Sequence, residues 1–343
     1  MLGLKVQLPL AEHWKKKLLD EGFFATNYRI QKEGDYIYYP ITARFPLKDT
    51  RVQIVEMDFL ELRRKKTLKE NLTAHLSSEE LHIVKTAHDV IGSIAIIEIP
   101  KDIEPHEHMI AQTLLESNPQ IKTVLKKAAI HDGTFRTQKM TYLAGVDTKE
   151  SIYKENGVRL TLNVEEVYFS VRLSTERKRI AEQVGHGEEI LVMFSGAAPY
   201  PVVLSKQTSA KSILGIEINP AGHRYGEENV RLNKCKNVSL ICGDVHTVIP
   251  QLLKENPGLR FDRIVMPLPK TADEFLTDAL SVAKQGTFIH FYDFLPESDF
   301  DEAKKKIAEA CTHAGVSYRI LRVVKCGQHA PHVFRICVDF ILL

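Results

Sequence analysis

A turn of small residues and two acidic residues, each next to an apolar segment, could together bind a nucleoside. The turn is Phe194–Pro199, and Glu217 lies 21 residues after Gly196, at the end of the next apolar segment. Small residues after a strand let the backbone approach a ligand, and such an acid can accept hydrogen bonds from ribose hydroxyls. Asp244, after the third apolar segment, is suitably placed for an adenine amino group. A lone acid at a strand end usually caps a helix, but the three features together favour an adenosine site.

From about Phe169 onward, short apolar runs alternate with helical stretches, which predicts a parallel sheet with crossover helices. The five candidate strands are Ile190–Phe194, Ser212–Ile218, Val238–Cys242, Arg263–Met266 and Thr287–Tyr292. A helix and two further strands follow, Tyr318–Lys325 and His332–Leu342, and their short connection requires an antiparallel pair. A doubly wound α/β sheet that ends in an antiparallel hairpin is typical of Rossmann-like class I methyltransferases. S-adenosylmethionine (AdoMet) is therefore the expected cofactor, and the absence of GxGxxG weakens a nicotinamide interpretation.

The segment Met266–Pro269, with two prolines, follows the fourth predicted strand. Proline cannot donate to a sheet ladder, so this segment must leave the sheet with free carbonyl groups. In methyltransferases this position faces the methyl acceptor, which makes Pro267 and Pro269 candidate substrate contacts. A rigid turn would explain the same residues equally well.

Two smaller α+β domains are expected before the catalytic domain. The predicted boundaries are 1–62 for the first domain, 63–168 for the second and 169–343 for the methyltransferase domain, with a linker at Arg63–Lys66. A strand is predicted at Thr134–Leu143 in the second domain. Positions 1–66 carry thirteen basic and nine acidic residues, and this local excess indicates a polyanionic partner only weakly.

Composition narrows the class of protein. With 44% hydrophobic and 26% charged residues, the chain is an ordinary globular one. Its longest uncharged run, Ile190–Ser205, is too short and too rich in glycine and proline to span a membrane. The five cysteines form no CxxC pair, so we expect free thiols, no metal site and a cytoplasmic location.

Motifs along almost the whole chain resemble the archaeal and eukaryotic tRNA (guanine-37 N1)-methyltransferases. The most specific are Tyr153–Arg159, which reads Tyr-Lys-Glu-Asn-Gly-Val-Arg, and Glu176–Arg177 before the cofactor region. The others are 28–30, 33–40, Ala87–Pro100, Val167–Leu173, Phe194–Gly196, Ile216–Pro220, Gly243–Val245 and Met266–Lys270. The resemblance implies a first domain that touches the tRNA elbow. It also implies that the other two domains enclose the anticodon loop, in a protein that we expect to be a monomer.

The resemblance also implies roles for individual residues. Glu176 matches the family's proposed general base, which would remove the N1 proton of guanine, and Arg159 matches the arginine that steadies the base. From the residues alone, Glu176 would be a surface partner of Arg179 and Arg159 a solvated strand residue. The expected cofactor contacts are Arg177, Phe194, Ser195, Gly196, Glu217, Ile218, Asp244, Val245 and Pro267. Tyr168, with Tyr142 and Phe169, is a candidate surface for stacking on a flipped base, although core aromatic residues are the commoner interpretation.

Three positions depart from the family pattern. Pro267 stands where asparagine is usual, Val192 replaces an acid, and Ala198 replaces the second glycine of the turn. These changes resemble an archaeal branch that also methylates carbon 7 of a tricyclic wyosine precursor, whereas Arg159 resembles the ordinary N1 enzymes. Two alternatives stay open at this point: transfer of the aminocarboxypropyl group of AdoMet, and a tRNA-binding protein without catalytic activity.

Overall fold

The computed structural model describes residues 1–47, 49–62, 66–128, 133–268 and 270–343. The chain divides into two compact units, Met1–Asn71 and Leu72–Leu343. Most of the predicted linker, 63–65, lies outside the described residues, as does Pro269. No helix among the described residues is both long enough and apolar enough to cross a membrane.

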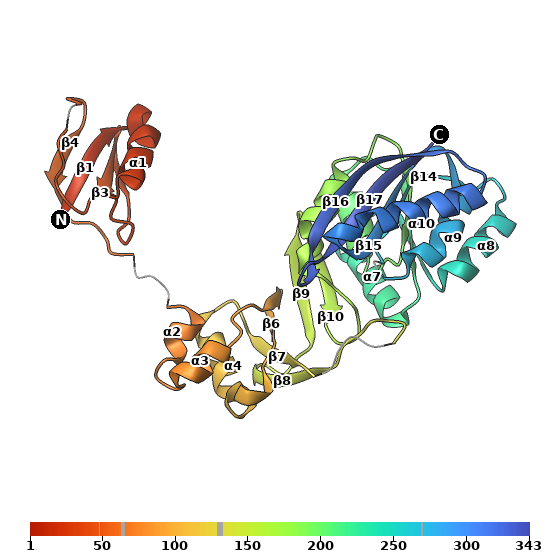
Figure 1. Ribbon diagram of the computed structural model, residues 1–343, viewed down its shortest axis with the longest axis horizontal. Helices are drawn as coiled ribbons and strands as arrows, with labels where there is room; N and C mark the ends of the chain where they lie inside the picture. Colours follow the sequence, from red (N-terminus) through yellow and green to blue (C-terminus); the bar gives the residue numbers. More distant parts are fainter. Residues whose placement is uncertain (48, 63–65, 129–132, 269) are drawn as a thin grey trace. The chain divides into compact units, whose positions relative to one another are not determined.

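The first unit is a four-stranded sheet with one helix (red and orange in Figure 1). Its elements are β1 (Leu2–Gln7), α1 (Ala11–Asp20), β2 (Gln31–Glu33), β3 (Tyr36–Pro40) and β4 (Gln53–Glu56), in the sheet order β2-β3-β1-β4. Trp14 and Leu18, one turn apart on α1, are buried against Leu4 and Val6 of β1. This spacing puts both side chains on one face of the helix, which explains the local core.

The short helix α2 (Leu68–Leu72) spans the boundary between the two units. The second unit then has α3 (Ser78–Ile83) and a middle sheet of order β5-β6-β7-β8 that packs against α4 (Glu107–Ser117). The strands are β5 (Asp89–Ile91), β6 (Ile94–Ile97), β7 (Thr123–Lys127) and β8 (Met140–Gly145). The predicted strand 134–143 is wrong in its first half, because 134–137 form a turn and bridge and β8 starts only at Met140. A hairpin of β9 (Glu150–Glu155) and β10 (Val158–Asn163) follows.

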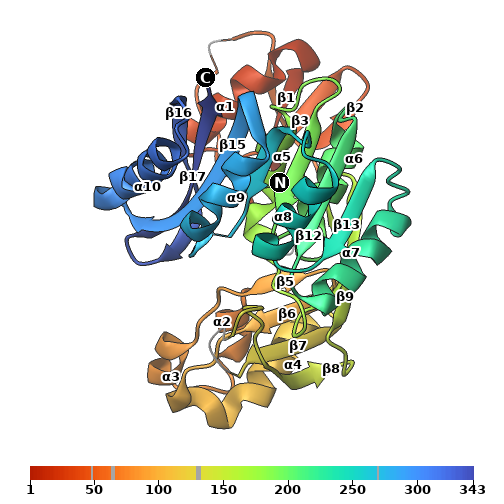
Figure 2. The same cartoon turned by 90° about the vertical axis from the view of Figure 1, so that its right-hand side faces the viewer.

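The largest sheet has seven strands in the order β13-β12-β11-β14-β15-β17-β16. Its parallel strands are β11 (Glu189–Met193), β12 (Ser212–Glu217), β13 (Val238–Cys242), β14 (Phe261–Met266) and β15 (Ala283–Pro296). β16 (Tyr318–Ala330) and β17 (Val333–Leu342) form an antiparallel hairpin, and β17 pairs with β15 (Figures 1 and 2). The predicted Rossmann-like α/β class with its terminal hairpin is therefore confirmed.

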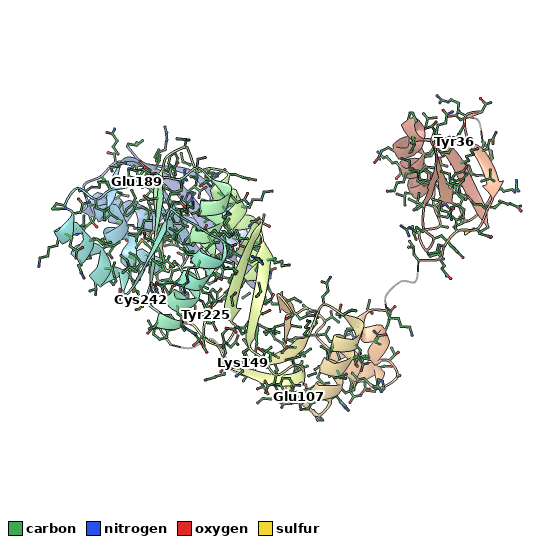
Figure 3. The ribbon with its side chains drawn as sticks, turned by 180° about the vertical axis from the view of Figure 1, so that it is seen from behind. Tyr36, Glu107, Lys149, Glu189, Tyr225 and Cys242 are labelled. Atoms are coloured by element: carbon green, nitrogen blue, oxygen red, sulfur yellow. The ribbon has the colours of Figure 1, made fainter. Side chains whose placement is uncertain are left out.

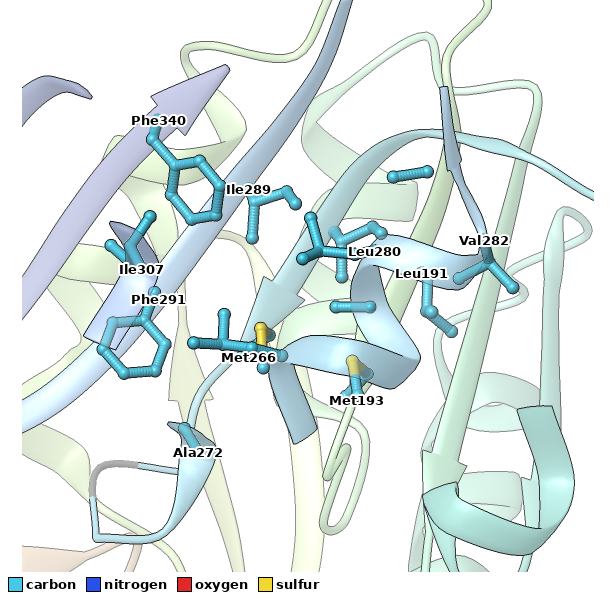
Figure 4. Packing of buried hydrophobic residues seen from close by; sticks show 14 of the residues in the cluster. Leu191, Met193, Met266, Ala272, Leu280, Val282, Ile289, Phe291, Ile307 and Phe340 are labelled. Carbon is cyan, nitrogen blue, oxygen red and sulfur yellow. The ribbon is translucent and has the colours of Figure 1, made fainter. Parts of the chain in front are cut away.

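Helices cover both faces of this sheet, because alternate residues along its strands present apolar side chains to opposite faces. Leu191 and Met193 of β11 pack with α8 (Val245–Glu255), α9 (Leu276–Ser281) and α10 (Phe300–His313), as Figure 4 shows in part. Ile190 and Val192 face the opposite core. That core contains α5 (Ser174–Ala181) and α6 (Pro199–Gln207), with side chains from α7 (Pro220–Leu232) and β10 packed in or against it. Val192 thus fills a packing position.

Within the second unit, β10 packs against both the four-stranded sheet β5-β6-β7-β8 (the middle sheet) and the seven-stranded sheet (the catalytic sheet). Val158 and Leu160 belong to the core beneath α5 and α6, whereas Leu162 packs with the strands of the middle sheet. Tyr225 of α7, labelled in Figure 3, joins that second core and donates its hydroxyl to Glu150 of β9 at 2.6 Å. The two sheets therefore share buried side chains, and cavities between them belong to one unit.

Candidate active site

A cavity of about 450 Å³ lies at the carboxyl ends of β11, β12, β13 and β14. The strand order reverses between β11 and β14, and open α/β sheets bind ligands at such a switch point. Its lining from the catalytic part includes Arg177, Phe194, Ser195, Gly196, Tyr200, Glu217, Ile218, Asn219, Asp244, Val245, Pro267 and Phe275. Residues 133–136, in the turn before β8, also line the cavity. The volume suits a nucleoside-sized ligand.

The turn after β11 is strained. Phe194 and Ala198 both adopt φ 60°, in the left-handed region that residues with a Cβ rarely occupy, and Gly196 has φ 56°. The turn is held because the N–H of Gly196 donates to Glu217 Oε2 at 2.5 Å and that of Ala198 donates to the carbonyl of Ser195 at 2.9 Å. Such outliers cluster at ligand sites, where the surroundings must maintain them.

The two predicted strand-end acids both bind the backbone and both face the cavity. Glu217 Oε1 accepts a hydrogen bond from the N–H of Asn219 at 2.8 Å, and burial raises the pKa of its carboxyl group although backbone N–H groups oppose that rise. Asp244 caps α8, accepting from the N–H of His246 through Oδ1 at 2.9 Å. Each carboxylate therefore serves as a local cap and still lies on the cavity wall.

The structure brings together all nine residues that the sequence places at the cofactor. Arg177, Phe194, Ser195, Gly196, Glu217, Ile218, Asp244, Val245 and Pro267 all line this cavity, and so does Tyr168. Arg177 is buried, binds both carboxylate oxygens of Glu155 at 2.5 and 2.6 Å, and lies over the ring of Phe169. The Glu155 carboxylate on β9 therefore neutralises the charge of Arg177. The paired arginine forms a fixed part of the cavity wall.

Glu176 is buried one layer behind that wall and is not among the lining residues. Arg179 donates to both of its carboxylate oxygens at 2.7 Å, and the hydroxyl of Tyr292 donates to Oε1 at 2.5 Å. Tyr200 lines the cavity, and its hydroxyl lies 3.0 Å from that of Tyr292. Two phenol groups thus connect the cavity wall to the carboxylate, and the surface ion pair considered from the sequence is in fact a buried one.

Behind Glu176, the ion pair continues into the sheet. Arg179 also donates to Asp339, and burial lowers the pKa of its guanidinium less than the hydrogen bonds to Glu176 and Asp339 raise it. Asp339 accepts from Nδ1 of His290 at 2.7 Å, and Arg263 donates to Nε2 of that ring at 2.7 Å. Burial raises the pKa of Asp339, but its hydrogen bonds from His290 and Arg179 dominate and hold it well below its usual range. The position and orientation of Glu176 therefore depend on a buried polar chain.

The catalytic role of Arg159 stays a prediction, because the structure does not place this residue at either cavity. Its side chain is exposed on β10, and it lines neither of the two large cavities. The backbone exchanges hydrogen bonds with Asn233 at the far end of α7, at 3.0 and 2.6 Å. Tyr142 is also exposed, and its hydroxyl donates to the carbonyl of Gly145. On β10, strand alternation turns Arg159 outward between the buried Val158 and Leu160.

A second cavity, of about 490 Å³, adjoins the first and shares with it Gly133, Arg136, Tyr168 and Phe169, among other residues. The sequence analysis did not single out Arg136, in the turn before β8, or Arg335, on β17. Burial lowers the pKa of the Arg136 guanidinium, and the nearby charge of Arg335 adds to this effect. Arg335 could have been noticed as one of two charges inside a largely apolar strand, whereas no local pattern marks Arg136.

Comparisons with known proteins agree with this geometry. The TRM5/TYW2 methyltransferase domain matches residues 151–321, the TYW2 N-terminal domain matches 68–148, and the tRNA methyltransferase 5 N-terminal domain matches 3–48. The chain is 34% identical to the tRNA (guanine(37)-N(1))-methyltransferase Trm5b of Pyrococcus abyssi, over 99% of this chain and 98% of that protein.

Two further relatives are informative. A tRNA (guanine(37)-N(1))/4-demethylwyosine(37)-methyltransferase, Taw22, of Nanoarchaeum equitans is 33% identical over 65% of this chain and 89% of its own length. The solved complex of aTrm5 with tRNALeu matches all of both chains at 26% identity, with a TM-score of 0.71. The chain belongs to the TRM5/TYW2 methyltransferase family.

Proposed function

We propose that this protein transfers the methyl group of AdoMet to N1 of guanosine-37 in tRNA. The observation that carries the proposal is the cavity at the switch point of the sheet, because all nine residues predicted to hold the cofactor lie on its wall. A relative that matches essentially the whole chain at 34% identity is a tRNA (guanine(37)-N(1))-methyltransferase, and a structural relative was solved with tRNA.

The cavity suits the adenosine part of AdoMet. Glu217 projects at the end of β12 with two backbone N–H groups holding its carboxylate, so its remaining lone pairs can accept ribose hydroxyls. Asp244 uses Oδ1 for the cap, and no hydrogen bond from the described residues occupies Oδ2, which can accept an adenine amino group. The strained turn 194–198 brings the backbone close to the ligand. Bound AdoMet supplies an electrophilic methyl group.

The protein must also remove a proton from N1 of guanine and stabilise the charge that then develops on O6. Glu176 is the proposed base, and the hydroxyls of Tyr200 and Tyr292 form the route from the cavity wall to its carboxylate. Arg136, rather than Arg159, is the proposed partner of O6, because Arg136 lines both cavities. A fixed guanidinium stabilises a developing oxyanion more than it stabilises the ground state.

A second activity, methylation of carbon 7 of a wyosine precursor, is favoured by one observation. Pro267 lines the cavity and offers no side-chain hydrogen-bond donor to the base, so the site lacks one contact that would restrict it to guanine. The Taw22 relative carries both activities in its name. Aminocarboxypropyl transfer is a third outcome that the same product analysis distinguishes.

The test is incubation of the full chain with AdoMet and an unmodified tRNA transcript, followed by mass spectrometry of the nucleosides. The expected product is 1-methylguanosine. A transcript with adenosine in place of guanosine-37 is the matched control and should stay unmodified. Equal methylation of both transcripts, or a product carrying an aminocarboxypropyl group, would overturn the proposal.

A further inference from the structure

Arg335, on the wall of the second cavity, is a buried cation whose charge no carboxylate of the described residues balances. Its exposed fraction is 9%, and Nη2 donates to the hydroxyl of Tyr168 at 2.8 Å. The guanidinium also lies over the ring of Phe294, its register partner on β15, 4.9 Å from the centroid. Its Nε is buried and has no hydrogen-bond partner within the described ranges.

Burying a charge without a counter-charge is costly, so such a group points to an anion that is absent from the protein itself. The other charges in the cavity do not supply one. Its two acids, Asp89 and Glu98, are each paired already, with Arg172 at 3.0 Å and with Lys127 at 3.0 Å. The described lining therefore has a net positive charge around Arg335.

Two observations point to a nucleotide as the source of that anion. The second cavity contains a stacked aromatic pair, Phe294 and His329, whose ring centroids lie 3.9 Å apart with planes inclined by 20°. Flat aromatic surfaces beside arginine are the usual way to hold unstacked bases. The two cavities also share Tyr168 and Arg136 as a common wall, so a nucleotide strand that enters one cavity can continue into the other.

We propose that the second cavity is a phosphodiester site, in which Arg335 binds the phosphate that joins the target nucleotide to its neighbour. The identity of the ligand as RNA rests on the proposed function. Tyr168 holds the guanidinium from one side and Phe294 supports its face, so Nε and Nη1 remain for phosphate oxygens. The carboxylate of AdoMet is the competing anion, and the test separates the two.

The test measures binding of a guanosine-37 anticodon stem-loop RNA to the full chain at several salt concentrations, with S-adenosylhomocysteine present to prevent turnover. One lost phosphate contact to single-stranded RNA lowers the slope of log K against log salt by about 0.7. Arg335→Gln should show this reduction and an affinity lower by about tenfold. Arg335→Lys keeps the charge and should keep the slope while binding more weakly.

Arg319→Gln is the matched control, because it removes an exposed arginine from β16, which pairs with β17, and should leave the slope unchanged. A methylphosphonate on either side of guanosine-37 provides a second arm that needs no variant. At one of the two positions it should reduce the wild-type slope and leave Arg335→Gln unaffected.

An unchanged slope in Arg335→Gln, or equal losses in the variant and wild type with both methylphosphonates, would overturn the phosphate site. A loss of AdoMet affinity with an unchanged RNA slope would assign Arg335 to the carboxylate instead. Because binding is measured without turnover, failure of this inference is distinct from failure of the proposed reaction, which the nucleoside products decide.

Discussion

The hydroxyl of Tyr292 donates a hydrogen bond of 2.5 Å to Oε1 of Glu176, the carboxylate predicted to be the general base. Both groups are buried, and Arg179 occupies both oxygens of the same carboxylate. Glu176 is thus held in one orientation behind the cavity wall. We expect Glu176 to accept the substrate proton through the hydroxyl groups of Tyr200 and Tyr292.

Glu176→Gln should lower the single-turnover methylation rate by about 10²–10⁴-fold, because the amide keeps the size of the side chain but cannot accept the proton. AdoMet affinity should change little, since Glu176 does not line the cofactor cavity. Rapid-quench methylation with excess enzyme measures the rate, and calorimetry measures the affinity.

A second variant, Tyr292→Phe, tests the route to Glu176. It leaves the carboxylate in place but removes the hydroxyl between it and Tyr200. If the phenol route is used, this variant should also be slow. A Glu176→Gln enzyme that methylates at the wild-type rate would show that the base lies elsewhere.

Asp244→Asn should weaken AdoMet binding by roughly tenfold, because the variant keeps a cap for α8 but presents a neutral group to the adenine. Asp278→Asn offers a comparison on α9, where the carboxylate binds His246 and does not line the cavity. Titration calorimetry on both variants decides the matter. Wild-type affinity in Asp244→Asn would remove this residue from the cofactor site.

Arg136→Ala should lower the methylation rate by about 10²-fold or more, whereas Arg159→Ala should leave the rate within about twofold of wild type. The reason is position: Arg136 lines both cavities, and Arg159 is exposed on β10. Single-turnover rates on the same transcript compare the two directly. The opposite ranking would restore the assignment that the sequence motif implied.

His290 should make the stability of the second unit depend on pH. Burial lowers the pKa of this imidazole, and the hydrogen bond to Asp339 offsets the effect only in part. The unfolded chain, with a histidine pKa of about 6.5, therefore binds a proton that the folded chain rejects. Stability is full above that pH and declines as the pH falls toward the lower pKa of the folded state.

The slope contributed by one such group is at most about 1.4 kcal/mol per pH unit. His290→Gln can still donate to Asp339 and accept from Arg263, and this variant should lack the decline in stability as the pH falls below about 6.5. Urea unfolding of both proteins across that range measures the difference. Parallel curves would mean that His290 titrates alike in both states.

The sequence predicts the catalytic sheet well because its strands and turns are local patterns. The five parallel strands, the terminal hairpin and the strand-end acids Glu217 and Asp244 all follow from apolar periodicity and from the residues after each run. The three-domain boundaries stay a prediction: β10 contributes to the cores on both sides of the predicted boundary at 168.

What the sequence leaves open concerns long-range placement. Arg159 lies in a specific motif, yet strand alternation and the packing of α7 decide where its side chain points. Asp339, His290 and Arg263 are charged or polar residues inside buried strands, and only the pairing of those strands brings them together. Arg335 lies further along β17 and donates to Tyr168, from a distant segment. The sequence marks them as exceptions to an apolar pattern but does not state their partners.

β10 inserts side chains into two hydrophobic cores at once. The middle sheet and the methyltransferase sheet should therefore unfold in a single cooperative transition. A substitution at Leu160 disturbs the core that contains α5 and α6, and one at Leu162 disturbs the core of the neighbouring sheet, although the two residues stand on one strand. A chimaera that exchanges one sheet for that of a relative would have to exchange this strand as well.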